Sequence, residues 1–190
     1  MTLFDKAATF AIKAHSNETR KLGKIPYVIH PFEVAAIAAT MTSDENVLSA
    51  ALLHDTIEDT DTTEHDLRLN FGERVTHLVM METEEKFDLP RWRSWQERKE
   101  KSLEELAECK ERDVKILWLS DKLSNMRSFY RIWEKDGNSF WSRMNQRDIT
   151  KQAWYYRTIA RLVSELKDQD AWKEYNSLVE TIFKGVPENA

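Results

Sequence analysis

The segment LSAALLHDTIEDTDTT (48–63) places His54, Asp55, Glu58 and Asp59 directly after a run of small and apolar residues. An unpaired charge beside a hydrophobic core is costly, so we expect these groups to have partners. On a helix, His54 lies one turn before Glu58, and Asp55 lies one turn before Asp59. A histidine nitrogen combined with carboxylate oxygens suits a divalent ion of intermediate hardness, such as manganese, iron, cobalt or zinc. The pattern predicts an ion at His54 and Asp55, with Glu58 and Asp59 beside it, where they can orient a water molecule.

A second His-Asp pair in the chain serves as an internal comparison. His65 and Asp66 lie in TTEHDLRLN, a polar helix start with no Glu-Asp pair one turn later. We interpret Asp66 as the partner of Thr63 in a capping box, and His65 as exposed. The dipeptide is therefore informative only in its apolar context and with the Glu-Asp pair that follows.

Two ligands do not complete a metal site, so further candidates are needed. Asp121 interrupts the apolar run VKILWLSDKLSNM, and Asn125 and Ser128 follow it at helical spacing. This polar line faces either solvent or a pocket. His30, in IPYVIHPF, is either a partly buried structural histidine or another ligand.

The elements that must position these side chains are predicted to be helices. The chain of 190 residues contains only four glycines and four prolines, and few runs alternate with period two, which favours an all-α protein of one domain, 1–190. Caps, such as Asp44 before the third of these helices, and apolar periodicity predict helices over 2–15, 31–41, 45–59, 63–72, 73–82, 95–110, 113–135, 149–167 and 171–184.

Composition limits the possible partners and compartments. A net charge of −5 argues against a general nucleic-acid or membrane binder, so a phosphate-bearing ligand requires a local basic cluster. The single cysteine, Cys109, excludes an intramolecular disulfide and is typical of a reducing compartment. The first residues show no signal-peptide pattern, and no stretch reaches membrane-spanning length. We expect a cytoplasmic protein, and the sequence indicates no particular oligomeric state.

Three segments, TRKLGKIPYVIHP, ALLHDTIEDT and LSDKLSNMRS, together resemble the hydrolase domain of the RelA/SpoT alarmone enzymes, and most closely their stand-alone small alarmone hydrolases. These belong to the HD phosphohydrolase superfamily. The resemblance implies an all-α HD-domain helical bundle around a central Mn²⁺ site, with core motifs in 15–131 and C-terminal helices in 149–184 packing on them. By motif position, the metal ligands are His30, His54, Asp55 and Asp121.

The resemblance also implies the reaction, which is removal of the 3′-pyrophosphate from guanosine tetra- or pentaphosphate (ppGpp or pppGpp) or a related alarmone. Glu58 and Asp59 match the residues that orient and activate the attacking water, and either can be the base. The side chains that match or suggest nucleotide contacts are Arg20, Lys21, Tyr27, Asn125, Ser128, Tyr155 and Arg157.

Two alternatives to this function stay open. An HD-type phosphohydrolase acting on a 5′-nucleotide or another phosphomonoester would use the same site but release orthophosphate. A non-catalytic alarmone sensor would bind the nucleotide without turnover, although it has no need of the Glu58-Asp59 pair.

Two clusters of aromatic and basic residues have packing as their simpler interpretation. In RWRSWQERKEK (91–101) we expect a solvated helix anchored by Trp95 rather than a nucleic-acid surface, although Arg98 or Lys99 can lean toward a phosphate. In WYYR (154–157) the aromatic rings are expected to pack, or Tyr155 and Arg157 close over a nucleotide.

Overall fold

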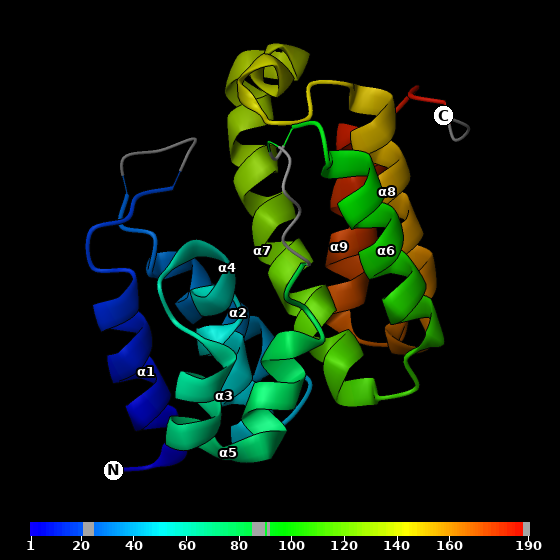
Figure 1. The fold of residues 1–190 in the computed structure, drawn as a ribbon. Helices are drawn as coiled ribbons and strands as arrows, with labels where there is room; N and C mark the ends of the chain where they lie inside the picture. The colour runs from blue at the N-terminus through cyan, green and yellow to red at the C-terminus, as the bar shows by residue number, and fades with distance from the viewer. Residues whose placement is uncertain (21–24, 85–89, 91, 188–190) are drawn as a thin grey trace. The chain divides into compact units, whose positions relative to one another are not determined.

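The computed structural model describes residues 1–20, 25–84, 90 and 92–187, and its regular structure in these ranges is helical (Figure 1). An isolated bridge joins Thr19 and Pro26. The all-α prediction is therefore confirmed. The α-helices are α1 (Leu3–Ala14), α2 (Ile29–Ala38), α3 (Glu45–Leu53), α4 (Thr56–Asp59), α5 (Glu64–Met80), α6 (Trp95–Glu108), α7 (Arg112–Asp136), α8 (Ile149–Leu162) and α9 (Asp170–Ile182).

The chain forms two compact units. Unit 1 comprises 1–83 and 111–124, and unit 2 comprises 84–110 and 125–190. The first half of α7 belongs to unit 1 and its second half to unit 2. Each unit is described by itself, so the single-domain expectation stays a prediction.

Helix α3 is central in unit 1, because it contacts α1, α2 and α5. Its residues from 50 to 53, AALL, are fully buried, and Ala7 and Ala11 of α1 are buried as well. Small side chains on both helices let their backbones approach closely, which leaves the end of α3 firmly placed. That end leads directly into His54.

Helix starts in unit 1 follow the predicted caps. Asp44 Oδ1 accepts a hydrogen bond from the Asn46 amide at 2.8 Å, and Thr63 and Asp66 form the predicted capping box at the start of α5. Gly72 has a φ of 80° and kinks α5, at the point where the sequence predicted one helix to end and another to begin.

The segment that contains the candidate site differs from its prediction in one respect. A helix was expected to run through His54 and Asp55, but α3 ends at Leu53 and the short α4 begins at Thr56. Side chains explain the break, because His54 Nδ1 bonds the carbonyl of Ala51 at 2.9 Å and Thr56 Oγ1 donates to the carbonyl of Leu53 at 2.7 Å. Such bonds compete with the regular helical ladder.

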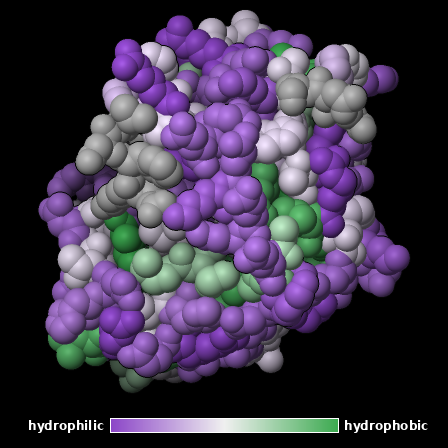
Figure 2. Space-filling model, turned by 45° about the vertical axis from the view of Figure 1, so that its right-hand side comes forward, coloured by the Kyte–Doolittle hydropathy of each residue, from purple (hydrophilic) through white to green (hydrophobic). Residues whose placement is uncertain are grey.

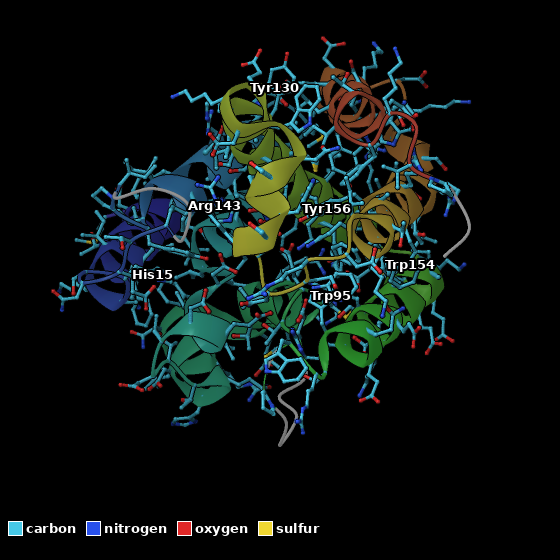
Figure 3. All side chains as sticks on the ribbon, turned by 90° about the horizontal axis from the view of Figure 1, so that it is seen from above. His15, Trp95, Tyr130, Arg143, Trp154 and Tyr156 are labelled. Carbon is cyan, nitrogen blue, oxygen red and sulfur yellow. The ribbon has the colours of Figure 1, made fainter. Side chains whose placement is uncertain are left out.

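Unit 2 is built from α6, α8, α9 and the second half of α7. In Figure 3, Trp95 of α6 and Trp154 of α8 come from neighbouring helices, with ring centroids 6.5 Å apart. Trp95 is buried, as expected for an anchor of α6. Helices α8 and α9 are joined by a hydrogen bond of 2.9 Å from the Tyr175 hydroxyl to the carbonyl of Tyr156.

The later helices end earlier than expected. α8 stops at Leu162 and a 3₁₀ turn (Ser164–Leu166) follows, whereas the sequence predicted helix to residue 167. Another 3₁₀ segment (Gly137–Arg143) follows α7.

The face shown in Figure 2 is mainly hydrophilic. None of the described helices combines the length and the apolar character needed to cross a bilayer.

Candidate metal centre

Two buried histidines of unit 1 face each other. His30, in the first turn of α2, and His54, at the end of α3, are 3% and 2% exposed, and their ring centroids lie 5.2 Å apart. Because an imidazole carries two polar nitrogens, each of these buried rings needs polar partners in the core.

Hydrogen bonds made by the Nδ1 atoms orient both imidazoles. His30 Nδ1 lies 2.8 Å from Ser124 Oγ, and this hydroxyl donates to Glu33 Oε2 at 2.7 Å. The hydroxyl proton is thus committed to Glu33, so His30 Nδ1–H must donate to Ser124 Oγ. In the same way, His54 Nδ1–H donates to the carbonyl of Ala51. Both Nε2 atoms therefore present their lone pairs to the same space, as in histidine metal ligands.

Two aspartates complete the group. His30 Nε2 lies 3.0 Å from Asp121 Oδ1 and 3.5 Å from Asp55 Oδ2. His54 Nε2 lies 3.0 Å from Asp55 Oδ2 and 3.6 Å from Asp121 Oδ1. Asp121 is 4% exposed, so its polar line begins in a buried site rather than in solvent.

These distances fit a single divalent ion. Two ligand atoms about 2.1 Å from one ion lie about 3 to 3.5 Å apart at right-angled or tetrahedral geometry. Among the described residues, the ligand atoms of His30, His54 and Asp121 all lie within 4.8 Å of one another. The buried Nε2 of His54 makes no hydrogen bond, which leaves it available as a ligand. The cluster is a possible metal site.

The charges in the cluster are strongly coupled. Burial lowers the pKa of His54, but the adjacent Asp55 and Asp121 outweigh burial and the net shift is well above the usual value. Burial also works to raise the pKa of Asp55, yet the neighbouring His54 and His30 bring it below its usual range. For His30, burial prevails and lowers the pKa. The carboxylates of the cluster thus favour positive charge between them, which a bound divalent ion would supply.

Tyr27 connects the cluster to the predicted catalytic pair. Its hydroxyl donates to Asp55 Oδ2 at 2.5 Å and lies 3.1 Å from Asp59 Oδ2. Burial, with the two carboxylates, raises the pKa of Tyr27, so the phenol keeps its proton. Glu58 is half-buried in α4 and Asp59 is exposed. The structure therefore places Tyr27 and Asp59 next to the candidate ligands, and leaves the assignment of the base between Glu58 and Asp59 as a prediction.

The predicted basic pair is described only in part. The Arg20 guanidinium lies 5.6 Å from the centroid of the Tyr27 ring, which places a cation near the cluster. Lys21 falls outside the described residues. The nucleotide contacts of Arg20, Lys21 and Tyr27 stay predictions.

Comparison with known proteins gives the family. A model described as an HD domain matches residues 7–143, which include every residue of the cluster. The chain belongs to the HD domain family. Its all-α fold and its paired histidines and aspartates agree with that membership.

Relatives of this HD domain carry informative names. It is 40% identical over 129 residues to the guanosine-3′,5′-bis(diphosphate) 3′-pyrophosphohydrolase MESH1 of Xenopus tropicalis, covering 66% of this chain and 69% of that protein. It is 40% identical over 130 residues to a guanosine-3′,5′-bis(diphosphate) 3′-pyrophosphohydrolase of Aquifex aeolicus, covering 68% of this chain. The match spans only 18% of the Aquifex protein.

A solved structure is similar over nearly all of the HD domain chain. It is a metazoan ortholog of SpoT described as hydrolysing ppGpp, with a TM-score of 0.73 and 27% sequence identity. The match covers 98% of both chains.

The HD domain cluster also contains two charged residues that sequence reasoning missed. Lys122 Nζ contacts Asp121 Oδ2 and lies 3.5 Å from Glu82 Oε1, and both Lys122 and Glu82 are buried. Lys122 has a sequence signal, since it follows Asp121 inside the same apolar helix. Glu82 has none, because it comes just after the end of α5 in a polar segment.

Four of the predicted nucleotide contacts lie in unit 2. Asn125 and Ser128, on α7, are half-buried, and Ser128 Oγ accepts a hydrogen bond from Arg131 at 3.2 Å. Tyr155 is 2% exposed and lies under the Lys99 ammonium, 4.5 Å from its ring centroid. Substrate roles for Asn125, Ser128 and Tyr155 stay predictions.

Arg157 of unit 2 is occupied by backbone contacts. Its guanidinium donates to the carbonyls of Phe183 and Val186, both at 2.9 Å, and the residue as a whole is 8% exposed. It thereby satisfies carbonyls at the end of α9, which lies beyond the segment that matches the HD domain model. These contacts favour the packing interpretation of Arg157.

We therefore predict that Arg157→Met acts on stability rather than on substrate binding. Charge-assisted hydrogen bonds lost from a buried site should lower the free energy of unfolding by about 3 kcal/mol. Urea unfolding followed by circular dichroism measures this loss, and KM for the nucleotide should not change. A tenfold rise in KM without loss of stability would instead support the nucleotide contact.

Proposed function

We propose that this chain is a Mn²⁺-dependent hydrolase that removes the 3′-pyrophosphate from ppGpp or pppGpp. The observation that carries the proposal is the convergence of two histidine Nε2 atoms and two aspartates in one buried cluster, with Asp59 tied to it through Tyr27. The substrate is supported by the names of the Xenopus and Aquifex relatives, and by the solved metazoan ortholog of SpoT.

The proposed ligands are His30, His54, Asp55 and Asp121. Imidazole nitrogens mixed with carboxylate oxygens suit manganese and its neighbours among the transition metals. A divalent ion bound there would supply Lewis acidity to the phosphoryl group and to the attacking water.

The chain's own residues carry the proton transfers and the positioning. Glu58 or Asp59 accepts a proton as the oxygen of water forms a bond to the phosphorus attached to the 3′-oxygen. The bond between that phosphorus and the 3′-oxygen breaks, and the 3′-oxygen takes up a proton. The products are GDP or GTP and pyrophosphate. Arg20 would offset charge on the phosphate oxygens.

Cytoplasmic location is part of the same proposal. It is supported by the single cysteine, Cys109, which is buried and free.

The deciding experiment is incubation of the purified chain with Mn²⁺ and ppGpp, followed by identification of the products by mass. We expect GDP and pyrophosphate in equal amounts, and no turnover after the metal is removed with a chelator. Orthophosphate released from 5′-nucleotides, with ppGpp left intact, would favour the phosphomonoester alternative. Binding of ppGpp without any product would favour a sensor.

A further inference from the structure

Glu82 is a buried acidic side chain that the proposed reaction does not use. It is 6% exposed, and neither of its carboxylate oxygens makes a hydrogen bond. Burial raises the pKa of Glu82 to about 8, with Lys122 acting in the opposite direction. A carboxylate in such surroundings is costly unless it is paired, so its place beside Lys122 calls for an explanation.

Lys122 links Glu82 to the metal centre. Its ammonium contacts Asp121 Oδ2, while the other oxygen of the same carboxylate, Oδ1, faces the Nε2 atoms of His30 and His54. The ammonium also lies 4.8 Å from the centroid of the Trp118 ring, and Lys122 is 9% exposed. Asp121 therefore contacts the Lys122 ammonium through Oδ2, while its Oδ1 is turned toward the proposed position of the divalent ion.

The formal charges explain why a second carboxylate is needed. Lys122 and a divalent ion both favour the ionised form of Glu82, and the charges of Asp55, Asp121 and Glu82 then together equal those of the ion and Lys122. Without Glu82, the charges of Asp55 and Asp121 alone would fall one short of those of the ion and Lys122. Repulsion between Lys122 and the ion would then act at short range and at low dielectric, where it is strong.

We propose that Glu82 is a positioning residue of the metal centre. Its carboxylate balances the charge of Lys122, so that the ammonium can contact Oδ2 of Asp121 without weakening the binding of the ion at Oδ1. This inference rests on the metal centre proposed above, and it concerns affinity for the ion rather than the identity of the substrate.

Titration of the metal-free chain with Mn²⁺, followed by isothermal calorimetry, tests the inference. Glu82→Gln keeps the shape of the side chain and removes its charge, and it should weaken Mn²⁺ binding about tenfold, as is typical when a residue supporting a metal ligand is changed. The double variant Glu82→Gln/Lys122→Met removes both charges and should return the affinity to within about threefold of wild type.

Glu73→Gln is the matched control. Glu73 also lies in unit 1, but its side chain is 77% exposed, so the same change of charge should leave Mn²⁺ affinity unaltered. A purely structural role for Glu82 would lower the melting temperature of Glu82→Gln without changing Mn²⁺ affinity, and that result would overturn the inference. A double variant that binds Mn²⁺ no better than Glu82→Gln would overturn it as well.

Two further outcomes are informative. If circular dichroism shows that Glu82→Gln is unfolded, Glu82→Asp replaces it, because it keeps the charge and withdraws the carboxylate by one methylene. A fall in affinity of about threefold supports the inference, and an unchanged affinity overturns it.

A wild-type chain that binds no Mn²⁺ removes the metal centre and the inference together, whereas one that binds Mn²⁺ but leaves ppGpp intact removes only the substrate assignment.

Discussion

Asp55→Ala is expected to abolish both binding of the divalent ion and turnover. Asp55 Oδ2 lies within 3.5 Å of both histidine Nε2 atoms, and its removal would also leave Tyr27 without its closest acceptor. Loss of the ion removes several kcal/mol of transition-state stabilisation, so kcat should fall by at least about a thousandfold. Calorimetric titration with Mn²⁺ measures the binding, and release of pyrophosphate measures the turnover.

The second His-Asp pair of the chain provides a matched control for this prediction. His54→Ala should behave like Asp55→Ala, whereas His65→Ala should keep wild-type metal affinity and activity, because His65 is exposed at the start of α5. Retention of Mn²⁺ by both His54→Ala and Asp55→Ala would contradict the ligand assignment.

Glu58→Gln is expected to lower turnover while leaving binding of the divalent ion intact. Glu58 lies in α4, directly after the candidate ligands, and it is half-buried. If it accepts the proton of the attacking water, its neutral isostere should lower kcat by about a thousandfold, within the usual range for a general base. Mn²⁺ affinity should stay within about threefold of wild type, since Glu58 is not among the proposed ligands.

Asp59→Asn is the companion variant. Asp59 is exposed to solvent whereas Glu58 is half-buried, so we expect the smaller loss of kcat here. The opposite order, with full activity in Glu58→Gln and none in Asp59→Asn, would assign the base to Asp59. Equal loss of Mn²⁺ in both variants would contradict the separation of roles.

Much of the fold is local information, which the sequence contains. The caps at Asp44 and Thr63 and the break at Gly72 depend on residues a few positions apart, and the structure has them where they were predicted. The same reasoning went wrong at His54 and Asp55, where side-chain bonds to the carbonyls of nearby residues end α3. Propensity and periodicity do not register that competition.

The sequence by itself determined the all-α class and the residue types that can hold an ion, because helical periodicity and donor chemistry are properties of short segments. Only the tertiary structure decided that Asp121 is buried beside His30 and His54, since solvent and pocket are equally compatible with its spacing. It also decided which nitrogen of His30 is free, through a hydrogen bond to Ser124, 94 residues away. The contact between Glu82 and Lys122 has the same origin, because pairing of residues distant in the chain is settled by packing and not by local pattern.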